Sequence, residues 1–365
     1  MSVYIFGAKA TAAGFYRALS FLKPERKVEA FIVSKKEDNV SAIWGCPVKT
    51  ISDVTQSLSG PELDKAEVYV AVPELAHREI RELLESNGFK NLIMIDSGME
   101  AKQMGQYYDL EGRYHSIHSL DPCGEESRIP VVTVYAASFY KDKPLSNKPI
   151  MAEYVKRIYL GCAGALREGI DISGQADFYD NEGDNISEKN PNRCEMTAHY
   201  WVWKNRLNTE DEYVGIYHYR RILDLTEEDL KKMKANDVDV VLPYPMIHYP
   251  NAAIQHTWYV PERDWELMKK VVWELYPAYG EKFDKIFSAP EFYNYNMMLA
   301  KKKVFADYCA WLYPILDRIE ELSEPKGIER RDRYTAYMSE SLETLYFMAN
   351  LKGLKIFHTG RILFV

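Results

Sequence analysis

The densest group of polar side chains in this 365-residue sequence lies between residues 177 and 221. Five of these side chains stand close together around a glycine turn: Asp184, Asn185, Ser187, Lys189 and Asn190. Amides, hydroxyls and a lysine can together hold a ribose, a base edge and a diphosphate. An Asx-rich turn that caps the following helix explains the same residues, so the sequence leaves a binding loop and a structural turn open.

A second candidate lies near the N-terminus, where the segment from Gly7 to Gly14 separates an apolar run from a helical stretch. Backbone N–H groups at the start of a helix face an anion, and glycine lets the anion approach closely. Lys9 and Thr11 can serve a phosphate there. The spacing is not that of a G-x-G-x-x-G loop, and no acidic residue ends the second strand, which disfavours NAD. A glycine that only permits a tight turn explains the same spacing.

The elements that position these residues alternate between the periods of strand and helix. Over the first hundred residues, the pattern predicts strands at 3–6, 28–33, 68–72 and 92–96, with helices at 12–22 and 75–87. Strands separated by helices predict a parallel sheet with right-handed crossovers.

A second α/β region is predicted after residue 130. Its strands are expected at 131–137, 213–217 and 238–242, and its helices at 194–205, 261–275, 303–322 and 333–351. The stretch 103–129 has no clear period and contains Gly, Asp, Pro and Ser, so we place the domain junction there. The predicted organisation is one domain over 1–110, a linker over 111–129 and a second domain over 130–365.

Composition and charge narrow the class of protein. The 46 Lys and Arg residues against 54 Asp and Glu give a net charge of −8, which disfavours a general nucleic-acid binder. No signal peptide is expected, and no apolar run approaches the roughly 20 residues of a membrane span. The cysteines show no C-x-x-C spacing and fit a reducing cytoplasm without a zinc site: Cys46, Cys123, Cys162, Cys194 and Cys309.

Several long motifs in fixed order carry a specific resemblance. They are G-D-N-I-S-x-K-N from Gly183, C-E-x-T from Cys194, Y-W-x-W-K-N from Tyr200 and Y-V-G-x-x-H-Y-R-R from Tyr213. With them, residues 130–360 resemble a bacterial family, first catalogued as a domain of unknown function, that occurs in capsule and exopolysaccharide gene clusters and is grouped with GT-A-type glycosyltransferases. The first hundred residues look like the Rossmann-like N-terminal domain of bacterial sugar O-acetyltransferases.

The resemblance implies an α/β fold class, with an N-terminal Rossmann-like parallel sheet and a C-terminal GT-A-like glycosyltransferase domain. The implied activity moves a hexosyl unit, with galactofuranose or galactose as candidates, from a UDP-linked nucleotide sugar to a lipid-linked saccharide in surface-polysaccharide synthesis. The implied place is the cytoplasm, at the inner face of the cytoplasmic membrane. The N-terminal domain would hold a nucleotide sugar or dock neighbouring enzymes.

GT-A enzymes generally hold a divalent metal on the diphosphate with Asp-x-Asp at the end of a central strand. The corresponding run here ends instead in His218, Arg220 and Arg221. We infer that these side chains neutralise the diphosphate in place of a metal, because arginine binds phosphate oxygens bidentately. Structural ion pairs of the two arginines with Asp184 or Glu195 are the alternative, and dependence on Mn²⁺ or Mg²⁺ stays open.

An inverting transfer needs a carboxylate within reach of the acceptor hydroxyl. Glu340 is the first candidate, because it lies on a late helix of the resemblance where GT-A enzymes often place the catalytic acid. Asp184 is the second. The family usually has an arginine where Ser341 stands here, which puts a role for that cation in doubt. A solvated Glu340 and a retaining mechanism both stay open.

The acceptor side is expected to include aromatic side chains that stack on sugar faces. Trp201, Trp203, Tyr293 and Tyr295 are available, and the spacing of the two tryptophans lets at most one of them line a cleft. Asn296 and His256 match positions of the resembled family, and we expect them near the sugar.

Two other functions are compatible with the sequence. A non-catalytic protein that binds nucleotide sugars or carbohydrate is permitted by the missing Asp-x-Asp. An NAD-dependent sugar oxidoreductase would use the first domain, although its glycine spacing is unlike that of the dinucleotide loop.

Overall fold

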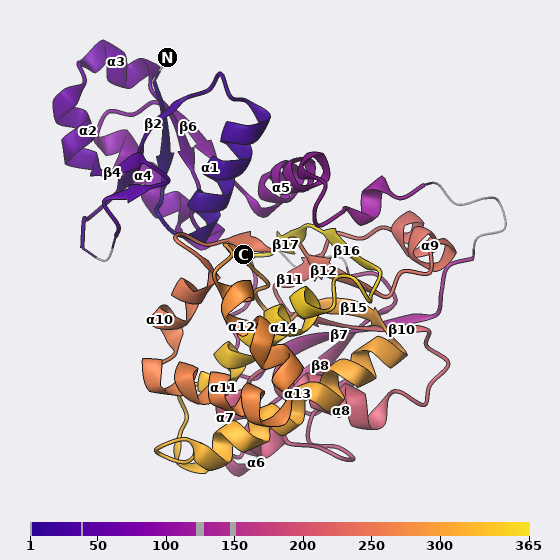
Figure 1. Cartoon of the computed structure of the whole chain (residues 1–365). Coiled ribbons are helices and arrows are strands. Elements are labelled where there is room, and N and C mark those ends of the chain that lie inside the picture. The colour runs from indigo at the N-terminus through magenta and orange to yellow at the C-terminus, as the bar shows by residue number, and fades with distance from the viewer. Residues whose placement is uncertain (1, 38, 122–127, 147–150) are drawn as a thin grey trace.

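A computed structural model describes the protein over residues 2–37, 39–121, 128–146 and 151–365. The chain is an α/β protein with two parallel-rich sheets, one built from residues 3–94 and the other from residues 132–363. Figure 1 shows the first as the upper part of the molecule and the second as the larger lower part. The predicted α/β class is confirmed.

The smaller sheet has six strands in the order β3-β4-β2-β1-β5-β6, and all neighbours except β3 and β4 run parallel. The order around β1 is that of doubly wound nucleotide-binding sheets. Its strands are β1 (Val3–Phe6), β2 (Val28–Val33), β3 (Ala42–Ile43), β4 (Cys46–Thr50), β5 (Glu67–Val70) and β6 (Asn91–Met94). Buried apolar residues alternate between two clusters, one on each face, so helices cover both faces.

The helices of this part are α1 (Ala10–Leu22), α2 (Ile51–Ser57), α3 (Gly60–Lys65), α4 (His77–Ser86) and α5 (Ser97–Glu111). Side-chain caps explain several starts. Thr50 and Asp53 form a capping box at α2, and the Asp96 side chain accepts from the Met99 N–H at α5. Gly112, with φ of 72°, ends α5 in the left-handed conformation.

The larger sheet has nine strands, with the main order β16-β12-β15-β10-β7-β8-β9, and β11 pairs with β10 while β17 pairs with β11. Its strands are β7 (Val132–Phe139), β8 (Val155–Leu160), β9 (Phe178–Tyr179), β10 (Tyr213–His218), β11 (Arg221–Leu223), β12 (Val240–Pro243), β15 (Met298–Lys301), β16 (Ile356–Thr359) and β17 (Arg361–Leu363). Strands β10, β7, β8 and β9 are parallel, whereas β15 is antiparallel to both β10 and β12. A two-stranded sheet pairs β13 (Met246–Ile247) with β14 (Glu291–Phe292).

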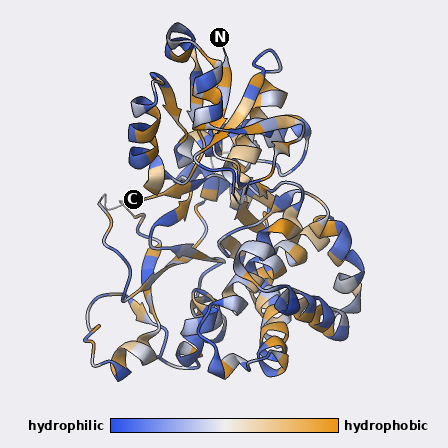
Figure 2. Cartoon of the chain, turned by 90° about the vertical axis from the view of Figure 1, so that its left-hand side faces the viewer, coloured by the Kyte–Doolittle hydropathy of each residue, from blue (hydrophilic) through white to orange (hydrophobic). Residues whose placement is uncertain are grey.

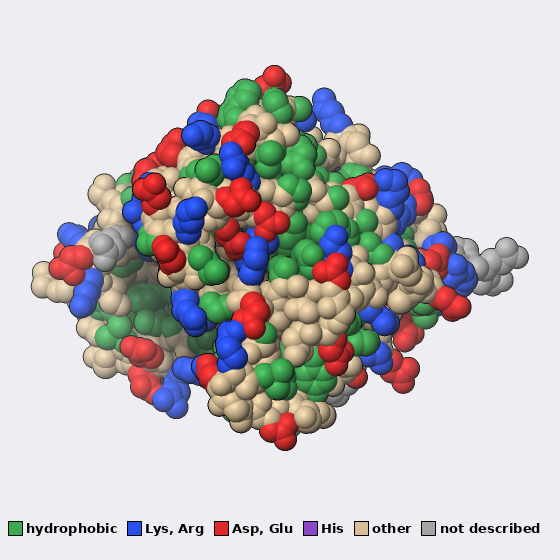
Figure 3. Space-filling view, turned by 90° about the horizontal axis from the view of Figure 1, so that it is seen from below, with side chains coloured by type: hydrophobic (Ala, Val, Ile, Leu, Met, Phe, Trp, Pro, Cys, Tyr) green, Lys and Arg blue, Asp and Glu red, His purple; other side chains and the backbone are tan. Residues whose placement is uncertain are grey.

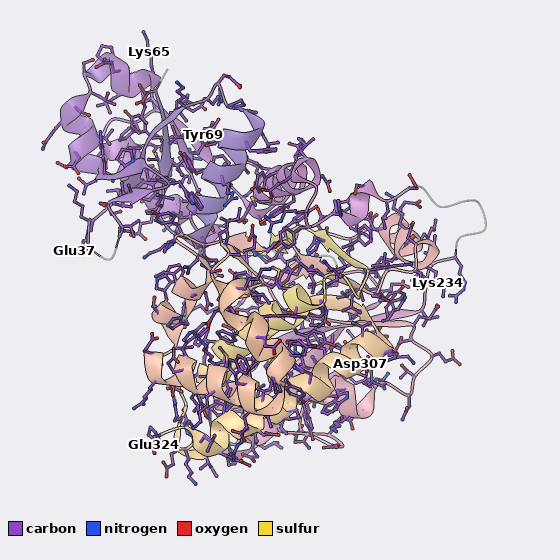
Figure 4. All side chains as sticks on the ribbon, in the orientation of Figure 1. Glu37, Lys65, Tyr69, Lys234, Asp307 and Glu324 are labelled. Carbon is purple, nitrogen blue, oxygen red and sulfur yellow. The ribbon has the colours of Figure 1, made fainter. Side chains whose placement is uncertain are left out.

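The helices of the larger part are α6 (Cys162–Arg167), α7 (Asn190–Arg193), α8 (Met196–Asn205), α9 (Glu227–Ala235), α10 (His256–Tyr259), α11 (Glu262–Leu275), α12 (Pro277–Phe287), α13 (Lys302–Leu322) and α14 (Tyr334–Ala349). The largest core cluster lies between the sheet and helices α8 and α11 to α14. In Figure 2 the hydrophobic colour concentrates on strands and on inward helix faces. Lys65, Lys234 and Glu324 lie at the edges of the molecule, while Tyr69 lies inside the smaller part (Figure 4).

The predicted strands and helices are confirmed, each to within about two residues at either end. The expectation of an irregular stretch from residue 103 is wrong, because α5 continues to Glu111. Helix α5 contacts α1 and β17, and the adjacent Tyr107 and Tyr108 are both buried. Burial on more than one face removes the amphipathic period that would have predicted this helix.

Within the described ranges, no helix is both long enough and apolar enough to cross a membrane. Four of the cysteines are present there as free thiols, while Cys123 lies outside the described residues.

Candidate functional site

Three neighbouring parallel strands, β10, β7 and β8, end at the same edge of the larger sheet. Their last residues are His218, Phe139 and Leu160, and a cleft of about 570 Å³ opens beyond them. Ligands of open α/β sheets bind outside the carboxyl ends of the strands, in pockets of about 300–1,000 Å³. A second hollow of about 680 Å³ adjoins the cleft and shares Ser138 and Tyr219 with it. This edge is the candidate site.

A buried carboxylate, Asp180, organises the wall of the cleft that follows β8. It accepts hydrogen bonds from the N–H groups of Gly161 at 2.8 Å and Cys162 at 3.0 Å. It also accepts from the hydroxyls of Ser187 at 2.6 Å and Thr197 at 2.7 Å. These bonds fix the turn after β8 against the start of α8. Asp180 is therefore a structural anchor of the site and has no oxygen left for a ligand.

Glu195 lies on the cleft wall directly before α8. Its Oε1 accepts a hydrogen bond of 2.7 Å from the Asn296 amide, and burial raises the pKa of its carboxyl above the ordinary value. A carboxylate with a raised pKa beside a cleft can take a proton at neutral pH. Burial also raises the pKa of the neighbouring Cys194 thiol to about 12, so the thiol stays protonated and is no nucleophile.

Two further glutamates of α14 stand behind Glu195. Glu340 accepts hydrogen bonds of 3.0 Å from the Tyr295 N–H and from the Gln255 amide. Burial, and then the charge of Glu195, raise the pKa of Glu340 to about 8. Glu343 is fully buried, neither of its oxygens has a partner among the described residues, and burial raises its pKa well above the ordinary value. The negative charge of Glu195 further raises the pKa of both carboxyls on α14, so Glu340 and Glu343 hold their protons at neutral pH.

The chain between these carboxyls is strained at Tyr295 and Asn296, with φ values of 80° and 49°. Left-handed conformations of residues other than glycine cost about 1–3 kcal/mol each and persist where the surroundings impose them. Here the Tyr295 N–H donates to Glu340, and the His218 Nε2 donates to the Tyr295 carbonyl at 2.6 Å. These two hydrogen bonds fix the left-handed backbone, and this conformation places the Asn296 amide within hydrogen-bond distance of Glu195.

Two cations of the cleft have no carboxylate partner among the described residues. Lys141 and Arg167 line the cleft in ion pairs with Glu168 and Glu188. In contrast, Arg331 and Arg333 come from the segment before α14, and neither is within 4.0 Å of a carboxylate in the part of the chain that the structure describes. Both side chains are exposed, and Arg333 adopts a left-handed φ of 61°. An unpaired guanidinium pair in a cleft is suited to an anion such as a diphosphate.

The structure brings together part of the predicted donor set. Ser187, Asn190 and His218 line the cleft. Asn185 does not, because its amide donates to the carbonyls of Asn181 and Gly183 within the turn. The remaining member, Lys189, lies on the surface with its ammonium on two acids of α13, Asp317 and Glu320. The polar turn is therefore mainly structural.

The expected charge of His218 is corrected. Burial lowers the pKa of its imidazole to about 4, so the ring is neutral and donates to a carbonyl. The Arg220 guanidinium lies over the Tyr219 ring, and Arg221 lies 4.3 Å from the centre of the Tyr295 ring. Neither arginine forms the ion pair with Asp184 or Glu195 that was the structural alternative, as far as the described residues extend.

The expected acceptor residues are mostly inside the protein. Trp201 is 4% exposed in the core, Tyr293 and Asn296 are fully buried, and His256 stacks at 4.3 Å on Trp265. These side chains therefore cannot stack on a sugar without moving.

Of the other expected contacts, the Tyr295 ring lies under Arg221 and Arg361, so it too is covered. Trp203 is stacked on Tyr313, outside the cleft. The second candidate base, Asp184, is exposed and accepts from the Tyr200 hydroxyl, away from the cleft.

The N-terminal glycine turn lies where the two parts of the molecule meet. A Cβ on Gly7, whose φ is 115°, would stand 2.7 Å from the Ala71 carbonyl oxygen, which explains the glycine. The Lys9 ammonium lies 5.1 Å from the centre of the Trp258 ring, and Thr11 lies in the first turn of α1. The cavity that Gly14 lines beside β13 has a volume of only about 30 Å³. A nucleotide does not fit there.

The residues at the end of β10 do not fit a divalent cation, because they are a hydrogen-bonded imidazole and two guanidinium groups. Across the described ranges, no three His, Cys, Asp or Glu side chains come together as a metal site. Asp180 cannot change this, since protein donors saturate it.

Sequence reasoning overlooked four groups that shape the cleft: Asp180, Glu195, Arg331 and Arg333. Two signals were present. Glu195 belongs to the C-E-x-T motif, where it was considered only as an ion-pair partner. The run Arg330-Arg331-Asp332-Arg333 leads into the predicted helix 333–351. Asp180 gave no signal of its own, because its donors come from three separate points of the chain.

Comparisons with known proteins agree with this architecture. The sequence profile of the family described as "Domain of unknown function (DUF4422)" matches residues 147–351. Among solved structures, the chain is similar to the apo structure of the bifunctional glycosyltransferase WbbM, with a TM-score of 0.52 and 25% sequence identity. That similarity covers 64% of this chain and 45% of the WbbM chain, so it spans less than half of that protein. No curated protein matches the sequence significantly.

Proposed function

The chain belongs to the DUF4422 family, and from this membership and the open cleft we propose that it is a glycosyltransferase. It moves a hexosyl unit, with galactose or galactofuranose as the first candidates, from a nucleoside-diphosphate sugar to a saccharide acceptor. The observation that carries the proposal is the cleft at the carboxyl ends of β10, β7 and β8, with Glu195 and two arginines, unpaired among the described residues, on its walls. The similarity to WbbM supports the same chemistry.

The donor nucleotide lies in the cleft, and Arg331 and Arg333 bind its diphosphate. This assignment replaces Arg220 and Arg221, whose guanidinium groups lie over aromatic rings. Guanidinium groups neutralise the charge that develops on the leaving diphosphate, which lowers the barrier to its departure. EDTA tests the dependence on Mn²⁺ or Mg²⁺. Turnover that survives EDTA supports neutralisation of the diphosphate by the arginines, and full loss of turnover contradicts it.

Glu195 is the proposed general base. The acceptor hydroxyl attacks the anomeric carbon, its proton passes to Glu195, and the bond to the diphosphate breaks with the nucleotide as leaving group. Glu340, the candidate from the sequence, stands behind Glu195 and holds a proton at neutral pH. Asp184 has no place in this step because it lies on the exposed turn.

The acceptor is proposed to be a lipid-linked saccharide at the inner face of the cytoplasmic membrane, with peripheral contact of the protein. This part of the proposal comes from the resemblance to enzymes of capsule and exopolysaccharide gene clusters. A nucleic acid is not proposed as a partner. On the face seen in Figure 3, Lys and Arg side chains are mixed with Asp and Glu, and no continuous basic stripe crosses that face.

The decisive experiment combines binding and turnover on the full chain. UDP, GDP, CDP, dTDP, NAD and NADP are compared for their effect on the melting temperature, since binding to the native state raises it. Release of UDP from UDP-galactose and UDP-galactofuranose is then measured with and without EDTA. Stabilisation by a nucleoside diphosphate together with release supports the transferase, and absence of both overturns it.

The second candidate is a non-catalytic protein that binds nucleotide sugars. It is favoured by the lack of carboxylates that could hold a metal at the end of β10. Such a protein would be stabilised by UDP but would release none from a UDP-sugar in the presence of any acceptor. Stabilisation by NAD alone would instead point to the oxidoreductase.

A further inference from the structure

A series of exposed aromatic rings begins beside the carboxyls of the cleft. Tyr337 lies one helical turn before Glu340 on α14, and it stacks on Tyr259 of α10 at a centroid distance of 4.7 Å. Tyr259 is 48% exposed and the adjacent Trp258 is 37% exposed. Aromatic rings with polar edges that remain partly exposed beside an active site are suited to the faces of sugar rings.

The series continues onto the smaller part of the molecule. Trp258 contacts at 5.6 Å the ring of His248, which is only 1% exposed, so the ring contacts pass below the surface here. Tyr249, the residue after His248, contacts the Trp44 ring at 5.2 Å. Trp44 lies in the turn between β3 and β4 and is 37% exposed. In Figure 1, α10 lies on the side of the larger part that faces the six-stranded sheet, which agrees with this path.

Trp44 occupies an unusual position. With Gly45 it forms the two-residue turn of the β3–β4 hairpin, and the φ values of these residues are 43° and 82°. Turns of this kind strongly prefer Asn-Gly, because both central residues need positive φ. A tryptophan in such a conformation is costly, and strain of this kind is commonly found where a side chain serves binding.

Trp44 also borders a surface groove of about 470 Å³ formed with α1 and α5. Its apolar surface includes Phe21, which is 50% exposed, and Tyr16, whose ring is within 9° of parallel to that of Trp44. Polar groups stand beside these rings. The Arg17 Nε donates to the Tyr107 hydroxyl at 2.9 Å, and that hydroxyl donates to Glu111 at 3.0 Å.

We propose that this groove and the rings leading to it bind the acceptor as an extended saccharide chain. The end that receives the sugar lies at Glu195, the following sugar units contact the exposed parts of Tyr259 and Trp258, and more distant units reach Trp44 and Phe21. The mixture of ring faces with a guanidinium, a carboxylate and hydroxyls suits carbohydrate better than a purely apolar partner. The inference rests on the proposed function. In it, the six-stranded part recognises long acceptors.

The test measures binding of defined saccharides to the full chain by titration calorimetry. The probes are di- and hexasaccharides of galactose, glucose and mannose. At least one hexasaccharide is expected to bind about tenfold more tightly than its disaccharide, since it reaches the groove. The variants Trp44→Ala and Phe21→Ala are expected to remove this length dependence while leaving UDP affinity unchanged. Trp273→Ala, which removes an aromatic 44% exposed on α11, is the matched control.

Three outcomes overturn the inference: no hexasaccharide binds, di- and hexasaccharides bind equally, or Trp44→Ala lowers the melting temperature without changing length dependence. The last result would make Trp44 only a contact between the two parts, and Phe21→Ala, which removes a ring packed on Tyr107, separates these cases. Length-dependent saccharide binding without any UDP binding would support the groove as a saccharide site and contradict the proposed glycosyltransferase activity. Release of UDP from the donor without length-dependent saccharide binding would support the transferase and contradict the groove as a saccharide site.

Discussion

The two sheets obey the same topological rule but treat their carboxyl edges differently. In the six-stranded part, helices α1 and α5 contact β13 and β17 beside the glycine turn, and the cavity left there measures about 30 Å³. In the nine-stranded sheet, the corresponding edge opens into a cleft of about 570 Å³. A parallel sheet with a glycine turn therefore indicates where a ligand can bind, while the neighbouring elements decide whether the place is open.

The difference extends to the electrostatics of the two edges. At the open edge lie two arginines without a carboxylate partner among the described residues and carboxyls whose pKa values are raised by burial. Such groups cost folding free energy and are typical of functional sites. At the covered edge, Gly7 and Gly14 face protein atoms of the molecule itself. The cavity beside Gly14 therefore has no room for a nucleotide.

The strongest way to break this comparison is Glu195→Gln. Removing the proposed base is expected to lower kcat about a thousandfold, because general base catalysis contributes about 10²–10⁴ in rate. UDP affinity should stay unchanged, since the diphosphate is bound by other groups. Asp184→Asn is the matched control and should change kcat less than twofold. Full steady-state turnover by the Glu195→Gln variant would show that Glu195 is not the general base and that the reaction does not depend on the carboxyl at the open edge.

The next largest effect is expected for Arg333→Ala. Loss of a charge-assisted hydrogen bond costs about 2 kcal/mol, which corresponds to about a thirtyfold rise in KM for the nucleotide sugar. Arg78→Ala, which removes an arginine from the exposed surface of α4, should leave KM as it is. If Arg220→Ala raises KM and Arg333→Ala does not, the diphosphate lies nearer β11 than proposed.

The covered edge is tested by Gly7→Ala. The new Cβ would stand 2.7 Å from the Ala71 oxygen in a left-handed conformation, so the variant should melt about 5 °C lower. Its UDP affinity should equal that of the parent protein. Gly60→Ala, where nothing lies within 4 Å, controls for the added methyl group. A loss of UDP binding in calorimetry would move the donor site to the smaller sheet.

The smallest effect concerns Glu340→Gln and depends on pH. The folded protein holds the Glu340 proton up to about pH 8, whereas the unfolded chain releases it near pH 4.5. Stability therefore falls as pH rises through this window, and a glutamine, which cannot ionise, avoids the loss. The variant should melt about 3 °C higher than the parent at pH 8.5 and equally at pH 4.5. Equal melting at both values would show that Glu340 titrates normally.

Much of the fold could be predicted from the sequence alone. Buried strands such as β1 and β10 are short apolar runs, and late helices such as α13 repeat their apolar residues with the helical period. Helix α5 shows the limit, since Tyr107 and Tyr108 face different neighbours and leave no single apolar stripe. Strands β4, β8, β15 and β16 were also missed, although each has four to six residues. The strands of two or three residues were missed because so short a run carries no period: β3, β9, β11, β13, β14 and β17.

The candidate site was predicted less well. Motif residues Ser187, Asn190 and His218 do reach the cleft, but Asn185, Lys189 and Trp201 serve the turn, the surface and the core. All of them are polar or aromatic, and the sequence does not distinguish a side chain that faces a ligand from one that faces its own backbone.

The sequence by itself determined the longer apolar strands, the amphipathic helices and the glycines that permit tight turns, because these depend on neighbours a few residues away. Only the tertiary structure decided which parallel edge is open and which carboxyl stands in it. The hydrogen bond between Asn296 and Glu195 joins residues 101 positions apart, and the pKa of Glu195 follows from the burial that such distant elements impose. Burial and desolvation are properties of the assembled molecule, and for that reason no local pattern records them.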